Sequence, residues 1–128
     1  MTGTIVAMAK SVAVIGASSD RRKFGNKALR AYAQQGYKVY AINPHETSIE
    51  GYPAFASVLD VPEPIDMATL YVQPDVAVRV MDELAAKKVG EVWLNPGADE
   101  PEVVARANEL GIRTIQACSL MALAGERY

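Results

Sequence analysis

The sequence predicts an α/β fold in which an open, parallel, five-stranded sheet, with strand order 3-2-1-4-5, carries helices on both faces. Short apolar runs alternate along the chain with segments whose apolar residues recur at helical spacing. The first run, residues 12–15 (VAVI), is apolar at every position, as expected of a strand buried on both faces of a parallel sheet. The 128 residues, half of them hydrophobic, are enough for one domain, which we expect to span residues 1–128.

Each predicted element is bounded by turn-forming or helix-ending residues. Strands are expected at residues 12–15, 37–42, 65–72, 89–94 and 112–115. Helices are expected between them at about residues 26–35, 74–88 and 101–110. In the second helix, the residues expected to form a buried stripe are Val76, Ala77, Val80, Met81 and Leu84. Less regular segments are predicted as a short helix or turn at 53–59, a turn or two of helix at 4–9 and an edge cover at 120–128.

Composition and charge narrow the classes of function. A formal net charge of −2 gives no general attraction to nucleic acid or to an anionic membrane surface. The single cysteine, Cys118, excludes an internal disulfide framework and, with no long apolar segment or leader pattern in the sequence, predicts a cytoplasmic protein. The sequence leaves the oligomeric state open, a homo-oligomer included.

The loop after the first strand, residues 16–26, is the main candidate binding site, because ligands bind beyond the carboxyl ends of the strands in parallel sheets. Gly16 permits a sharp turn, and the three small residues after it let an anion approach the backbone N–H groups. Residues 21–23 (RRK) add three positive charges. Either Gly25 or Asn26 is expected to cap the following helix. The pattern favours a phosphate-rich ligand over a solvated basic turn.

A plain nicotinamide dinucleotide fits this loop poorly. Its fingerprint needs a G-x-G-x-x-G pattern and an acidic residue at the end of the second strand. After Gly16 the next glycine is Gly25, and the second strand ends at Asn43 and Pro44. The loop has three cations at residues 21–23, and the second strand has no acidic residue at its end. This combination predicts a nucleotide with an extra ribose phosphate, such as coenzyme A or NADP.

No catalytic machinery is evident in the sequence. His45, the sole histidine, has no recognisable nucleophile partner, and a contact to phosphate or adenine is the stronger hypothesis for it. The predicted strands end in small, proline or amide residues and lack paired carboxylates. Cys118 follows the last strand and is expected to be a small buried residue; a sharper hypothesis is that it forms a mixed disulfide with a ligand thiol.

Several motifs together resemble a known family. They are VAVIGAS at 12–18, KFGN at 23–26, GYKVY at 36–40 with Asn43-Pro44, VWLNPG at 92–97, and Ala117-Cys118. In this order they are similar to the small stand-alone CoA-binding proteins of bacteria and archaea, which are similar in turn to the CoA-binding domain of the succinyl-CoA synthetase alpha subunit. Many members of that family have lysine at the position of His45 and glutamine at that of Asn95.

The resemblance implies a Rossmann-like, CoA-binding domain and a set of contacts. Gly16, Ala17, Ser18 and Ser19 would hold the pyrophosphate, with Phe24, Gly25 and Asn26 completing the loop. Arg21, Arg22 or Lys23 would lie near the 3'-phosphate. Asn43, Pro44 and His45 would flank the adenosine. Val72, Gln73 and Pro74 would line the pantetheine path together with Asn95, Pro96 and Gly97.

Two hypotheses of function follow. The first is a non-catalytic module that binds coenzyme A or an acyl-CoA for sensing, transport or regulation, with no metal. The alternative is a small NADP-linked or acyl-transfer enzyme, against which the missing nucleophile-base pair counts. CoA retained by the purified protein, without an NADPH fluorescence change, would favour the first.

Overall fold

The centre of the fold is β1 (Ser11–Ile15), whose five residues are all buried. The computed structural model describes residues 10–125. Because side chains alternate along a strand, Val12 and Val14 join one hydrophobic cluster, and Ala13 and Ile15 join another on the opposite face of the sheet. The apolar run therefore forms a strand covered on both faces, as its composition predicts.

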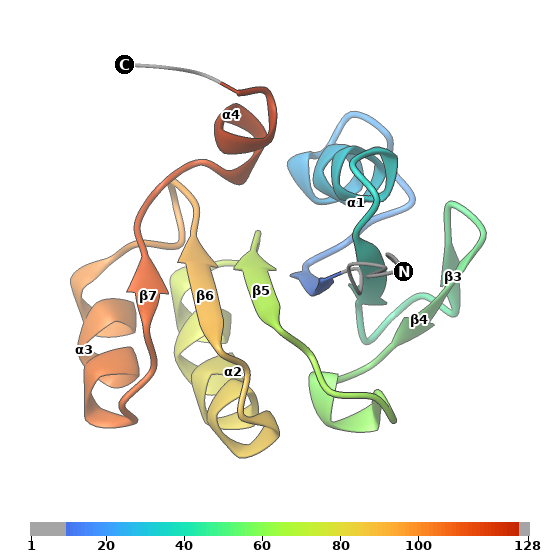
Figure 1. Ribbon diagram of the computed structural model, residues 1–128. Coiled ribbons are helices and arrows are strands. Elements are labelled where there is room, and N and C mark those ends of the chain that lie inside the picture. Colours follow the sequence, from blue (N-terminus) through green and yellow to red (C-terminus); the bar gives the residue numbers. More distant parts are fainter. Residues whose placement is uncertain (1–9, 126–128) are drawn as a thin grey trace, which may run out of the picture.

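Seven strands form one sheet in the order β3-β4-β2-β1-β5-β6-β7 (Figure 1). On one side of β1 lie β2 (Lys38–Ile42), β4 (Tyr52–Phe55) and β3 (Ser48–Ile49). On the other side lie β5 (Met67–Leu70), β6 (Glu91–Leu94) and β7 (Thr114–Ile115). Every neighbouring pair is parallel except β3 with β4, which is antiparallel.

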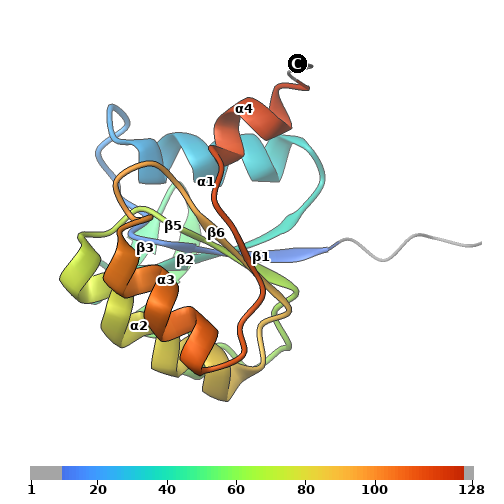
Figure 2. The same cartoon turned by 90° about the vertical axis from the view of Figure 1, so that its left-hand side faces the viewer.

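Helices cover both faces of this sheet (Figure 2). One face carries α1 (Phe24–Gln34) and the short α4 (Ser119–Leu123), and the other carries α2 (Pro74–Lys87) and α3 (Pro101–Glu109). A single turn of 3-10 helix, Val58–Asp60, precedes β5. The result is the Rossmann-like arrangement, with a mixed and mostly parallel sheet.

The predicted strand order is wrong at one position. The third predicted strand, residues 65–72, forms β5 and pairs with β1 on the side away from β2, instead of lying beyond β2. The place beyond β2 is taken by β4, in the segment 53–59 that was expected to be a helix or turn. Pro53 favours a turn locally, yet it is tolerated in a strand this close to the sheet edge. Pairing with β2 and β3 decides the conformation.

The predicted cap of the first helix is also wrong. The helix begins at Phe24, its N-cap is Lys23, and no side chain caps it. Gly25 and Asn26 instead lie buried within its first turn. The helices α2 and α3 begin at the prolines expected for them. The helix expected at residues 4–9 lies outside the described residues.

No helix in the described part of the chain is long and apolar enough to span a membrane.

Candidate functional site

The carboxyl ends of three neighbouring strands lie level at one edge of the sheet. Ile15 in β1 pairs with Ile42 in β2 and with Leu70 in β5. The chain leaves β1 toward β2 on one side and returns to β5 on the other, so the strand order reverses here. This is the position at which open α/β sheets bind their ligands.

Gly16 closes this edge of the sheet. Its N–H donates to the Ile42 carbonyl at 3.0 Å, and its φ is +88°. A Cβ at this position would lie 2.4 Å from the Tyr71 carbonyl oxygen. Only glycine therefore fits between the ends of β2 and β5.

Gly25 brings the first turn of α1 against the start of the loop. A Cβ on Gly25 would lie 2.1 Å from the Gly16 carbonyl oxygen, closer than real Cβ atoms approach. The helix N-terminus, with its positive dipole end, consequently lies directly beside the loop.

Two asparagine side chains fix the loop from different elements. Asn43, after β2, donates its amide to the Ala17 carbonyl at 2.8 Å. Asn26, fully buried in α1, donates to the Ser18 carbonyl at 2.9 Å and accepts from Arg30 Nε at 2.7 Å. The shape of the loop base is therefore set before any ligand binds.

A carboxylate already occupies one loop amide. Glu46 Oε2 accepts the Ser19 N–H at 3.0 Å and lies 3.5 Å from the Asn43 amide nitrogen. Hydrogen bonds from the Ser19 side chain and backbone, with Lys23 nearby, hold the pKa of Glu46 below its usual range. The loop thus stabilises an anion in this structure, although that anion comes from the protein itself.

The tip of the loop is charged but internally paired. Arg22 donates from Nε and Nη2 to the two carboxylate oxygens of Asp20, each at 3.0 Å. These bonds, with the Arg22 N–H, lower the pKa of Asp20 to about 2. Arg21 lies 3.3 Å from Glu50, and the Arg22 side chain is 91% exposed. Two of the three predicted phosphate-binding cations are thus engaged with carboxylates.

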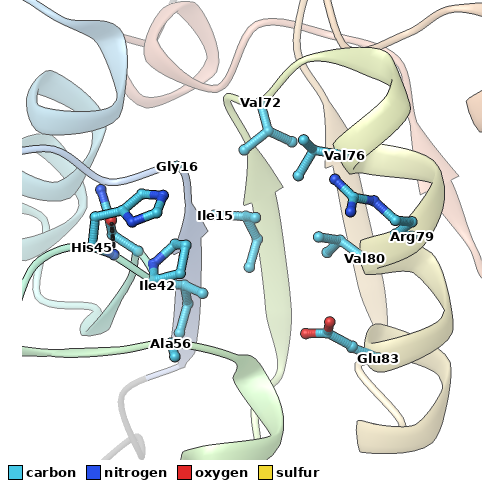
Figure 3. Close-up of a pocket in the computed structure, with 12 residues that line it drawn as sticks. Ile15, Gly16, Ile42, His45, Ala56, Val72, Val76, Arg79, Val80 and Glu83 are labelled. Atoms are coloured by element: carbon cyan, nitrogen blue, oxygen red, sulfur yellow. Dashed lines mark hydrogen bonds between the residues drawn. The ribbon is translucent and has the colours of Figure 1, made fainter.

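Two adjoining cavities lie at this edge of the sheet. The α2 cavity, of about 410 Å³, lies between the ends of β1 and β2 and the side of α2 (Figure 3). Its lining is mainly aliphatic, with a few polar groups; besides the shared residues it comprises Ile15, Ile42, Pro44, Ala56, Arg79, Val80 and Glu83. Both cavities share Gly16, Asn43, His45, Val72 and Val76.

The second, or loop, cavity has a volume of about 720 Å³. It is lined by the loop at residues 16–26, here called the glycine loop, and by residues that follow the ends of β5 and β6. Its own residues are Ser18, Lys23, Phe24, Gly25, Glu46, Leu70, Tyr71, Gln73, Pro96, Gly97 and Ala98. Phe24 is 63% exposed, with Lys27 Nζ 5.3 Å from its ring centre. The two cavities together form one crevice with an aliphatic part and a more polar part.

Some of the expected site residues line neither cavity. They are Ala17, Ser19, Arg21, Arg22, Asn26, Pro74 and Asn95. Asn95 is only 2% exposed, because its amide donates to Thr69 and to the Leu70 carbonyl and accepts the Ser119 N–H at 2.8 Å. Its role in the structure is to join β5, β6 and the start of α4.

The structure also adds residues that the sequence did not identify. Val76 and Val80 were expected in the core, yet they are half-buried and line the α2 cavity with Arg79 and Glu83. Positions 76, 79, 80 and 83 follow the i, i+3, i+4, i+7 spacing of one helix face, which could have indicated them. Glu46 lies in a loop whose sequence carries no such signal.

The described residues contain no cluster of metal-binding side chains. No group of three or more histidine, cysteine or acidic residues in residues 10–125 is placed to hold a metal ion. Cys118, the N-cap residue of α4, is half-buried and lines neither cavity. The site is built from backbone, aliphatic surface and a few charges, which suits binding through shape.

Comparisons with known proteins show the family of the chain. A family model described as "CoA binding domain" matches residues 10–124. The chain is 37% identical over 92 residues to acetate–CoA ligase [ADP-forming] I of Archaeoglobus fulgidus. The matched region covers 71% of this chain but only 13% of the ligase. The chain thus spans about an eighth of that relative's length.

Solved structures of small proteins match more completely. A hypothetical protein from Pyrococcus horikoshii superposes with a TM-score of 0.85 at 26% identity, covering 91% of this chain and 82% of that one. The protein cell-free ID.343 from Thermus thermophilus gives a TM-score of 0.81 at 32% identity, covering 91% and 89%. On the family match, which includes nearly all of the described residues, this chain belongs to the family of CoA-binding domains.

Proposed function

We propose that the chain binds coenzyme A or an acyl-CoA across the α2 and loop cavities, as a non-catalytic module for sensing, transport or regulation. The observation that carries the proposal is the pair of adjoining cavities with different linings. CoA has a matching division into a flat aromatic base, a charged diphosphate and an extended pantetheine arm.

The adenine base fits the α2 cavity, whose walls include Ile15, Ile42 and Val80. The diphosphate fits the glycine loop, where Lys23 lines the loop cavity and the N-terminus of α1 lies close. The pantetheine arm would run past Gln73 toward Pro96 and Gly97. The closely packed Gly16 and Gly25 support this assignment, because they hold the loop in one shape.

The absence of catalysis is proposed from the lining of the site. His45 is the only histidine of the chain, and its backbone N–H, not its ring, donates to the Asn43 side chain. The acidic groups at the crevice are engaged with neighbouring groups: Glu46 accepts from Ser19, and Glu83 accepts from Ser57 at 2.5 Å. Since the chain spans only a small part of the ligase that it resembles, the ligase reaction is not proposed for it.

Backbone NMR on the ¹⁵N-labelled protein tests the proposed site. Adding CoA should shift the amides of Gly16, Gly25 and Gly97 in the loop cavity and of Val76 and Val80 in the α2 cavity. Amides of α3, on the far side of α2 from the sheet centre, should move little. Shifts confined to α3 or α4 would contradict the site, and no shift at any CoA concentration would contradict the function.

A further inference from the structure

The cations around the crevice differ in how they are engaged. At the loop tip, Arg21 and Arg22 are paired with Glu50 and Asp20, and neither lines a cavity. Arg79, on α2, lines the α2 cavity, and no salt bridge among the described residues involves it. Arg79 is therefore the arginine whose charge is available to a ligand in that cavity.

The two ends of the α2 cavity also differ in charge. Figure 3 shows Arg79 and His45 on opposite walls, near Gly16 and Val76, with Glu83 farther along α2 toward Ala56. The Glu83 carboxylate is held by the Ser57 hydroxyl at 2.5 Å. A phosphate group is repelled by this carboxylate and attracted by the guanidinium, so it belongs at the Arg79 end.

The positive end of the α2 cavity lies where the ribose of a bound nucleotide would be. The residues shared by the two cavities, Gly16, His45 and Val76 among them, lie where a base in the α2 cavity would connect to a diphosphate in the loop cavity. The ribose joins those two parts, so its substituents lie between the walls that carry His45 and Arg79. A base bound in this way would direct its exocyclic amine, a hydrogen-bond donor, toward Glu83.

We propose that Arg79 binds the ribose 3'-phosphate of CoA and so determines the preference for CoA over dephospho-CoA, with a His45 ring N–H donating from the opposite wall. This inference rests on the proposed function. A guanidinium suits the role because its planar donors form two parallel charge-assisted hydrogen bonds to one phosphate. On this proposal the contact is made by Arg79 and not by Arg21 or Arg22, which, with Lys23, the family resemblance implies for it.

Calorimetric titration of the full chain with CoA and dephospho-CoA tests the proposal. Arg79→Gln should weaken CoA roughly tenfold, the size of a lost charge-assisted bond, and leave dephospho-CoA within about twofold. Arg22→Gln should leave the ratio of the two affinities unchanged. Arg113→Gln removes an equal charge from an arginine that lines neither cavity and should change neither affinity. Thermal unfolding of each variant checks that these exposed substitutions leave the fold intact.

The possible outcomes separate this inference from the proposed function. If wild type binds CoA and dephospho-CoA equally, or if Arg79→Gln weakens both equally, Arg79 does not read the 3'-phosphate, although CoA binding stands. If Arg22→Gln instead loses the preference for CoA over dephospho-CoA, the 3'-phosphate contact belongs to the loop tip. If wild type binds neither compound, both the inference and the proposed function fail.

Discussion

The base and the tip of the glycine loop are built on opposite principles. The base, formed by Gly16, Gly25 and Asn26, is held by close backbone packing and a buried amide. The tip, formed by Asp20, Arg21 and Arg22, has two exposed arginines and a half-buried aspartate, and it satisfies its charges with neighbouring side chains. From this difference we infer that ligand recognition at the loop depends on shape at its base and little on charge at its tip.

Substitution in the loop base should have the largest effect. Gly25→Ala places a Cβ 2.1 Å from the Gly16 carbonyl oxygen, so α1 and the loop must separate. We expect the free energy of unfolding to fall by roughly 1–3 kcal/mol and CoA affinity to fall by at least about tenfold. Denaturant unfolding and calorimetry measure the two quantities.

Gly36→Ala is the matched control. It adds the same methyl group at a φ of +89°, with no atom within 4 Å of it. We expect a loss of about 1 kcal/mol in stability from backbone strain and unchanged CoA affinity. Equal affinity loss in the two variants would show that general destabilisation, and not the shape of the loop base, governs binding.

Filling the α2 cavity should have the next largest effect. Val76→Trp places an indole at the junction of the two cavities, where we expect the base to meet the ribose, and should weaken CoA by roughly tenfold or more. Asp75→Trp introduces the same side chain at an exposed neighbour that lines neither cavity, and should bind CoA as wild type does. Full affinity in Val76→Trp would place the bound nucleotide elsewhere.

The sequence predicted correctly those structural features that a single segment determines. The apolar run of β1, the Gly16 turn and the prolines that begin α2 and α3 all act locally, and each prediction from them is confirmed. The strand order could not be derived, because nothing within residues 65–72 says on which side of β1 they pair. Asn95 follows a strand as a ligand contact would, but its burial depends on Thr69 and Ser119, which come from distant segments.

Removing the charge of the Glu46 carboxylate should have a smaller effect on CoA affinity, and in the opposite direction. Glu46 lines the loop cavity and holds the Ser19 N–H, so its charge repels an incoming phosphate. Glu46→Gln should tighten CoA by about two- to fivefold, as measured by calorimetry, and the effect should shrink at high salt. Weaker binding in this variant would mean that the carboxylate helps to hold the ligand.

The loop tip should show the smallest effect on binding. Arg22→Gln should change CoA affinity by less than about twofold, because an exposed ion pair contributes little. A loss of CoA affinity as large as that in Gly25→Ala would contradict the view that the charge of the loop tip matters little for binding.

The same pair has a defined pH dependence. Because Arg22 lowers the pKa of Asp20 from 3.8 to about 2, the contact favours folding at pH values above 3.8 and is lost as pH falls through about 2. Carboxyl NMR of Asp20 should titrate near 2 in wild type and closer to 3.8 in Arg22→Gln. An unchanged midpoint would mean that the pair is not formed in solution.

The central claim is that this crevice is shaped for CoA, and calorimetric titration of the full chain with CoA and with NAD tests it most directly. Both compounds carry an adenosine diphosphate, but only CoA has the 3'-phosphate and the pantetheine arm. We predict saturable binding of one CoA per chain and NAD binding at least about tenfold weaker, as expected from the loss of a charge-assisted contact. NAD binding as tight as CoA, or no binding of CoA, would contradict the account.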